Sequence, residues 1–279
     1  MIGIELRKQV LRPRTLVTLA ALAAFGIGLV IALEITGGGR PEPVGDIPLL
    51  LVPRSSGFTA PVIALSSTMK FFLPLAVAIF AGEAVAGEAV WGSLRQALAS
   101  GASRSRFLGA KALVAALLGL AAVVVVPLAA LIVGVAGYGW RPLAVTDGGA
   151  GLIQGPPAVF GTGATLVRLG LGTAFVAAGM ASIFSFAFFL STVTNHALVA
   201  VAGGVGLTIV SRVFNADYLP GVAVLNAYAP NNNVDLWLHL FLKQPGSAGM
   251  LGFLVLQAGY TVLFLGLAWW WFRRRDVLT

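Results

Sequence analysis

The sequence contains no cysteine, only two histidines and few charged residues: Asp, Glu, Lys and Arg make up 10% of its 279 residues. Without cysteine, the chain forms no disulfide and has neither a thiol nucleophile nor a Cys-ligated metal. Soluble domains carry roughly 25% charged residues, whereas this chain is 58% hydrophobic, with a mean hydropathy of +0.93. The composition therefore predicts a membrane protein with several spans.

Motifs for catalysis are also missing. The chain has no Gly-x-x-x-x-Gly-Lys-Ser/Thr phosphate loop, no His-Glu-x-x-His zinc pair and no Gly-x-Ser-x-Gly nucleophile turn. Asp235 and His239, four residues apart, could hold a metal, but no third ligand is evident, and such a pair is more often a surface hydrogen bond. The chain is therefore predicted not to be an enzyme and to hold no cofactor of its own.

The hydrophobic runs predict an all-α fold in one transmembrane domain, residues 1–279, with six transmembrane helices. The expected spans are residues 15–35, 61–82, 111–137, 164–192, 197–215 and 250–272. Residues 1–14 predict an amphipathic segment on the membrane surface, and residues 36–58 and 138–163 read as loops rich in Gly and Pro. Residues 217–249 are expected to form an extracytoplasmic loop with a short helix at 234–242.

The distribution of positive charge predicts the orientation. Placing both termini and residues 83–111 in the cytoplasm puts eleven of the eighteen Lys and Arg residues on that side, in agreement with the positive-inside rule. The net charge of +8 is then explained by anionic lipid headgroups, and no binding of nucleic acid is predicted. We expect a multi-pass protein whose termini are both cytoplasmic.

One long polar segment, residues 83–111, interrupts the hydrophobic runs and carries helical spacing. It reads Glu88-x-x-x-Gly92-Ser93-Leu94-Arg95, followed by Leu98, Ser103-Arg104 and Lys111. This pattern resembles the signature between the second and third spans of ABC-2 type transporter permeases. In that family Thr is usual where Ser93 stands, and Pro-Val-Ser-Arg is common where residues 101–104 read Gly-Ala-Ser-Arg.

The resemblance implies an ABC-2 permease fold, like that of type V exporters, in the plasma membrane of a bacterium or archaeon. Such a permease pairs with a second permease subunit, identical or related, and with two copies of an ATPase subunit that binds ATP and Mg²⁺. Residues 83–110 would then form an amphipathic coupling helix on that ATPase. By this resemblance the contact includes Glu83, Glu88, Gly92, Ser93, Leu94 and Arg95, with Arg104, Arg106 and Lys111 at the return to the membrane.

Four other charged residues map near the outer ends of the expected spans: Glu34, Lys70, Arg168 and Arg212. They predict either a shared polar patch in the outer leaflet or independent side chains that reach the interface, and the second interpretation is preferred. Two further functions remain as alternatives: a stand-alone secondary transporter or channel, and an intramembrane enzyme that modifies lipids. No motif in the spans selects a substrate.

Overall fold

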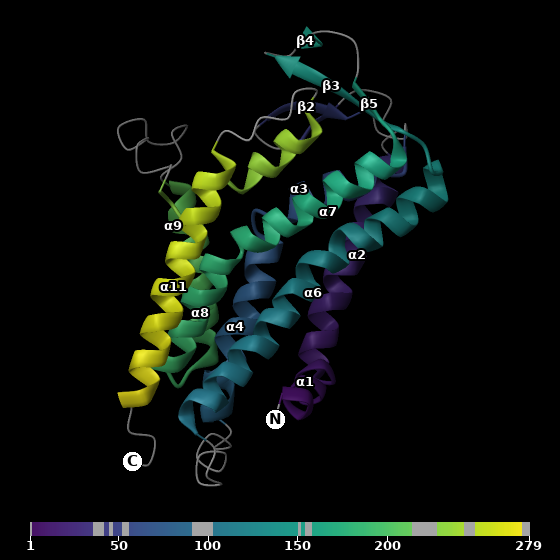
Figure 1. The fold of residues 1–279 in the computed structure, drawn as a ribbon. Coiled ribbons are helices and arrows are strands. Elements are labelled where there is room, and N and C mark those ends of the chain that lie inside the picture. Colours follow the sequence, from purple (N-terminus) through teal and green to yellow (C-terminus); the bar gives the residue numbers. More distant parts are fainter. Residues whose placement is uncertain are drawn as a thin grey trace.

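The structure, a computed structural model, describes residues 2–35, 42–44, 47–51, 56–90, 103–149, 152–153, 158–213, 228–242 and 249–274. Helices run along the length of the molecule, and a small sheet covers one end (Figure 1). The first helix, α1 (Ile2–Val10), and the last turn of the final helix, α11 (Met250–Arg274), lie at the opposite end. We call these the sheet end and the basal end.

Four helical stretches are long and apolar enough to cross a membrane. They are α2 (Pro13–Ile35), α6 (Arg104–Tyr138), the consecutive helices α7 (Thr162–Gly179) and α8 (Ala181–Val193), and α11. A fifth stretch counts if α3 (Thr59–Thr68) and α4 (Phe72–Val90), which meet at a bend of 59°, form one span. The protein is therefore membrane-embedded, and the described helices support four or five of the six expected spans.

The remaining expected span, residues 197–215, corresponds to α9 (Ala197–Val213), which has 17 residues. Its small residues permit close packing, as the spacing of Ala200 and Gly204 predicts. A Cβ added at Gly204 would lie 2.9 Å from the Cβ atoms of both Ala78 in α4 and Ala187 in α8. Helix α9 is thus held against α4 and α8 at a distance that only a glycine permits.

The sheet is not part of the all-α prediction. Its strands are β1 (Glu42–Val44), β2 (Ile47–Leu51), β3 (Leu143–Gly149), β4 (Leu152–Ile153) and β5 (Ala158–Phe160). They pair antiparallel, in the order β1-β2-β3-β4, with β5 also on β3. The interpretation of residues 36–58 and 138–163 as loops was wrong for these strands, because Leu50 pairs with Thr146 across 96 positions. Local composition carries no signal for such a pairing.

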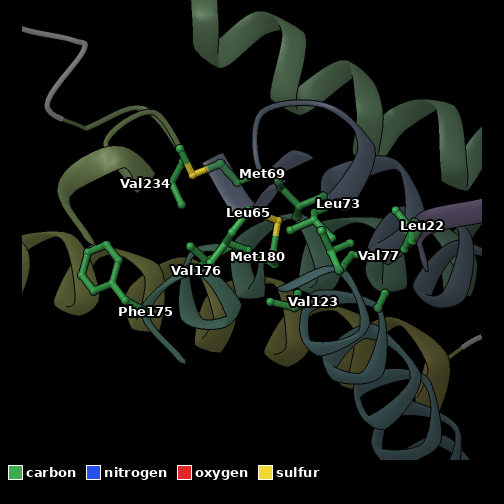
Figure 2. Packing of buried hydrophobic residues seen from close by; sticks show 14 of the residues in the cluster. Leu22, Leu65, Met69, Leu73, Val77, Val123, Phe175, Val176, Met180 and Val234 are labelled. Atoms are coloured by element: carbon green, nitrogen blue, oxygen red, sulfur yellow. The ribbon is translucent and has the colours of Figure 1, made fainter. Parts of the chain in front are cut away.

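The core lies between α3, α4, α6, α7 and α8. It includes the fully buried side chains of Leu65, Met69 and Leu73, with Val176 and Met180 from the α7–α8 junction (Figure 2). Pro127 lies inside α6, which continues through it as one helix. Helix α4 packs most extensively on α8 and α9 and also contacts α6, so it lies inside the helical assembly.

The expected short helix at 234–242 is confirmed as η2 (Val234–Phe241), although it is a 3₁₀ helix. Trp237, Leu238 and Phe241 are fully buried, and η2 packs mainly on α7. Because Trp237 and Phe241 also contact each other edge to face, at 5.8 Å between ring centroids, the segment is anchored by its aromatic side chains.

Candidate functional site

A cluster of buried charges joins three helices at the basal end. The ammonium group of Lys111 in α6 donates to Glu88 in α4 at 2.5 Å and to Glu5 in α1 at 2.6 Å. The ammonium group of Lys8 in α1 donates to the same Glu88 oxygen at 2.8 Å. We call Glu5, Lys8, Glu88 and Lys111 the basal cluster.

The charges of the basal cluster balance one another. Two carboxylates face two ammonium groups, and the Glu88 and Lys111 side chains are only 4% and 3% exposed. Gln9 donates to Glu5 at 2.8 Å, and Thr15 donates to the backbone carbonyl of Gln9 at 2.8 Å, so α1 is also tied to the start of α2. Since Glu88 and Lys111 are buried and each has two partners of opposite charge, removing either one would leave an excess of charge of one sign in the cluster.

A second ion pair and a set of backbone contacts strengthen the same end. Arg14 in α2 pairs with Glu83 in α4 at 2.5 Å. Arg104, at the start of α6, donates to the carbonyl oxygens of Phe272 at 3.4 Å and Arg273 at 3.2 Å, at the end of α11. The basal ends of α1, α2, α4, α6 and α11 are therefore tied together by charged side chains.

The structure separates the residues that the resemblance grouped as an ATPase contact. Gly92, Ser93, Leu94 and Arg95 lie outside the described residues. Glu88 and Lys111 are buried and bond to each other, whereas Arg106 is exposed. Glu83, Glu88 and Lys111 thus bond to other residues of this protein. Residues 91–102 connect α4, which carries the two glutamates, to α6, which carries Lys111.

The sequence prediction missed Glu5 and the roles of Lys8 and Arg14. Residues 1–14 were interpreted as a surface segment whose cations face lipid headgroups. The available signal was Glu5, the single acidic residue among four cations and an apolar face, because an acid is out of place on a helix that binds anionic lipids. Its partner Lys111, 106 positions away, could not be found from spacing.

At the other end of α4, a second group of contacts holds η2. Lys70, in the break between α3 and α4, pairs with Asp235 in η2 at 3.2 Å, and the indole N–H of Trp237 donates to the sulfur of Met69 at 3.2 Å. From α7, Arg168 donates to the carbonyl of Leu240 at 2.5 Å. We call Met69, Lys70, Arg168, Asp235 and Trp237 the η2 joint.

Close packing and aromatic contacts complete the η2 joint. A Cβ added at Gly172 in α7 would lie 2.3 Å from a ring carbon of Trp237, so only glycine permits the indole to approach α7 this closely. The guanidinium of Arg168 also stacks on Phe160, with its central carbon 3.9 Å from the ring centroid. The position of η2 against α7 thus depends on Gly172 as well as on the Lys70–Asp235 ion pair.

The expected outer charged residues divide into two groups. Lys70 and Arg168 reach the same segment, η2, so they act together, although on the protein and not as a patch toward lipid. Arg212 lies on α9, and neither of these contacts involves it; the side chain of Glu34 lies outside the described residues. Asp235 pairs with Lys70, and no group of three His, Asp or Glu side chains able to hold a metal occurs in the part of the chain that the structure describes.

A comparison with protein families gives one match. Residues 49–278 match a family described as a protein of unknown function (DUF2705). The chain belongs to this family. The region that matches DUF2705 contains the whole η2 joint together with Glu88 and Lys111, whereas Glu5 and Lys8 precede it. No match is found among curated proteins.

Proposed function

We propose that this protein is the membrane permease subunit of an ATP-driven exporter of the ABC-2 type, with six spans and both termini in the cytoplasm. The proposal is supported by the pattern in residues 83–111, by the apolar helices and by the position of α4. The observation that carries it is that α4 is tied at both ends by charged side chains. Glu83 and Glu88 hold its basal end, and Lys70 holds its start to η2.

In this proposal α4 transmits movement along the membrane normal. Residues 91–102 connect the end of α4 to the start of α6, and a partner ATPase that binds ATP and Mg²⁺ docks on them. The basal cluster makes α1, α4 and α6 move as one body, because separating these helices would break the ion pairs that join them and leave their charges unpaired. The bend of 59° above Phe72 then passes the movement to α3 and η2.

The proposed roles of the residues follow from this placement. Gly92, Ser93, Leu94 and Arg95 contact the ATPase, and the exposed Arg106 borders that contact. Glu83, Glu88, Arg104 and Lys111 fix the helices behind it. The pathway itself is formed with a second permease subunit in the plasma membrane of a bacterium or archaeon, and the ATP chemistry belongs to the partner ATPase.

The test is co-expression with an ATPase encoded beside the gene, followed by purification in mild detergent. We expect a stable complex that hydrolyses ATP, and we expect Arg95→Glu to weaken association because it reverses a charge in the contact. Arg141→Glu is the matched control, because Arg141 is exposed at the sheet end and the reversal there should leave association unchanged.

Glu88→Lys is a poor test of the same contact. It would place three ammonium groups together inside the basal cluster, so a loss of function could follow from misfolding alone. A purified, folded protein that binds no ATPase and whose Arg95→Glu variant transports normally would contradict the exporter proposal.

One observation favours a second candidate, a stand-alone secondary transporter. Broken helices and buried charges are common at the coupling sites of such proteins, and here the α3–α4 break and the Glu88–Lys111 pair provide both. Proteoliposomes without ATPase distinguish the two candidates. Uptake driven by a proton or sodium gradient would support the secondary transporter, whereas the exporter proposal expects none.

A further inference from the structure

Three polar side chains are buried where α7, α8 and α11 meet the turn that precedes η2. Ser182 in α8, Asn231 in the turn and Gln257 in α11 are 0%, 2% and 1% exposed. Among the described residues, the Ser182 hydroxyl and both side-chain amide atoms of Asn231 and Gln257 have no hydrogen-bond partner. We call these three residues the buried polar set.

Gly179 brings the buried polar set together. A Cβ added at Gly179 would lie 3.3 Å from the amide oxygen of Asn231 and 3.2 Å from the ring of Phe253 in α11. Ser182 follows Gly179 by three residues, and Gln257 follows Phe253 by one helical turn, on the same face of α11. The set therefore gathers around the contact between the α7–α8 junction and α11.

The buried polar set holds five of the buried side-chain atoms without a hydrogen-bond partner among the described residues. Many hydroxyls within the helices donate to their own backbone, as Ser66 does to Val62 and Thr173 does to Leu169. Ser182 makes no such bond, although it is fully buried. Because buried polar groups in native proteins almost always have partners, five unsatisfied atoms on three residues that flank the Gly179–Phe253 contact point to a ligand that supplies them.

We propose that the buried polar set binds an uncharged hydrogen-bonding group, an amide or a hydroxyl, of an amphiphilic molecule. The side chains of Asn231 and Gln257 each offer a donor and an acceptor, which match an amide or a hydroxyl. A charged group would be desolvated there, because the residues around Gly179 that the structure places against the set are Val234 and Phe253. Phe253 stacks on Phe175, with 5.0 Å between centroids, and offers an apolar surface for the rest of the molecule.

The η2 joint controls entry to the buried polar set. Val234, the first residue of η2, contacts the Gly179 position, and Trp237 closes on Gly172 one helical turn further into η2. Val234 and Asn231 lie 3.1 and 3.3 Å from a Cβ added at Gly179, so the segment that carries η2 packs closely over this side of the set. The structure is thus a closed form, and a ligand enters when η2 lifts from α7.

This inference rests on the proposed function, since it names the substrate class of the exporter, but its test uses no ATPase. Thermal denaturation of the purified protein in detergent is measured with dodecanamide, dodecanoate or dodecyltrimethylammonium, which carry uncharged, negative and positive headgroups. We expect dodecanamide alone to raise the denaturation midpoint, because a ligand stabilises the form that binds it. The Gln257→Leu variant should fold, since it removes unsatisfied atoms, and should lose the response to dodecanamide.

Entry is tested separately with Gln257→Cys, which carries the only thiol because the chain has no cysteine. Adding Gly172→Ala to this variant drives a methyl group into Trp237. The rate of labelling by N-ethylmaleimide should then rise about tenfold, which corresponds to a shift of about 1.4 kcal/mol in the equilibrium toward the open form. Added Gly170→Ala is the control, since a Cβ there meets nothing within 4 Å. Ala268→Cys, buried on the same helix, should stay unlabelled in every background.

The proposal is wrong if dodecanamide shifts neither protein, if it shifts wild type and Gln257→Leu equally, or if the charged amphiphiles act as strongly. Equal labelling with Gly172→Ala and Gly170→Ala would overturn the role of η2 in entry. Failure of these tests leaves the association with an ATPase untouched, and failure of that association leaves these results standing, so the two proposals are distinguishable.

Discussion

The two ends of α4 are held in different ways. At the basal end, the Glu88–Lys111 pair is almost fully buried, and three helices share one cluster, although Lys8 is 46% exposed. At the η2 joint, the Lys70–Asp235 pair is 27% and 11% exposed and is supported by the contacts of Trp237 and Arg168. The difference indicates that the basal end is fixed and the η2 joint is the movable one, because an ion pair that water reaches contributes less than a buried pair.

The largest effect is expected from breaking the basal cluster on one side. Glu88→Ala removes one of the two carboxylates that pair with the buried Lys111 and the carboxylate that pairs with the half-exposed Lys8. The free energy of unfolding should fall by about 3 kcal/mol, the lower end of the range for a broken buried pair, because Glu5 still pairs with Lys111. Denaturation of the purified protein in detergent measures the change. The matched variant Glu88→Ala with Lys111→Met should recover part of the loss, and strictly additive effects of the two changes would show that the pair does not interact.

A smaller effect is expected at the η2 joint from packing alone. Gly172→Ala forces a methyl group to within 2.3 Å of the Trp237 ring, and overpacking of this kind costs about 1 to 3 kcal/mol. Gly170→Ala, two residues away on the same helix, meets no atom and should stabilise α7 by up to about 1 kcal/mol through helix propensity. Equal stability of the two variants would mean that Trp237 does not sit on Gly172.

The contact of α9 with the middle of α4 serves as a reference for the effects expected at the two ends of α4. Gly204→Ala in α9 would push against Ala78 and Ala187 at 2.9 Å and should cost about 1 to 2 kcal/mol, less than Gly172→Ala because the overlap is smaller than at 2.3 Å from Trp237. Gly206→Ala, one position beyond the contact face, meets nothing within 4 Å. The same denaturation experiment distinguishes them, and a stable Gly204→Ala variant would show that α9 is not in close contact with α4.

How far the sequence predicts the molecule depends on the range of each interaction. The long apolar helices and η2 follow from local hydrophobicity, and the close face of α9 follows from Ala200 and Gly204 four positions apart. The bend that divides residues 61–82 was missed, because Lys70 was read as a side chain reaching for the interface. The sheet was missed because β2 and β3 come from segments about 90 residues apart.

The candidate site shows the same limit. Glu88 and Lys111 were selected for a contact with an ATPase, which stays a prediction, and spacing alone does not say that both charges are buried. Lys70 and Arg168 were expected to act independently, and their common target, η2, becomes visible only when the chain is folded. The partners that hold the two ends of α4 include Lys8 of α1, Arg14 of α2 and Asp235 of η2, and only tertiary structure brings those elements to it.

The smallest effect is expected for the ion pair of the η2 joint, and it sharpens the comparison most directly. A double-mutant cycle of Lys70→Met and Asp235→Asn should give a coupling free energy of about 1 kcal/mol or less, because the Lys70 side chain remains partly exposed and the pair is 3.2 Å apart. The corresponding cycle of Glu88→Gln and Lys111→Met should give a larger value, since both side chains are almost fully buried. Raising the salt concentration should weaken only the first coupling, because buried pairs are screened much less than exposed ones. Equal couplings at the two ends would remove the reason for treating the basal end as fixed and the η2 joint as movable.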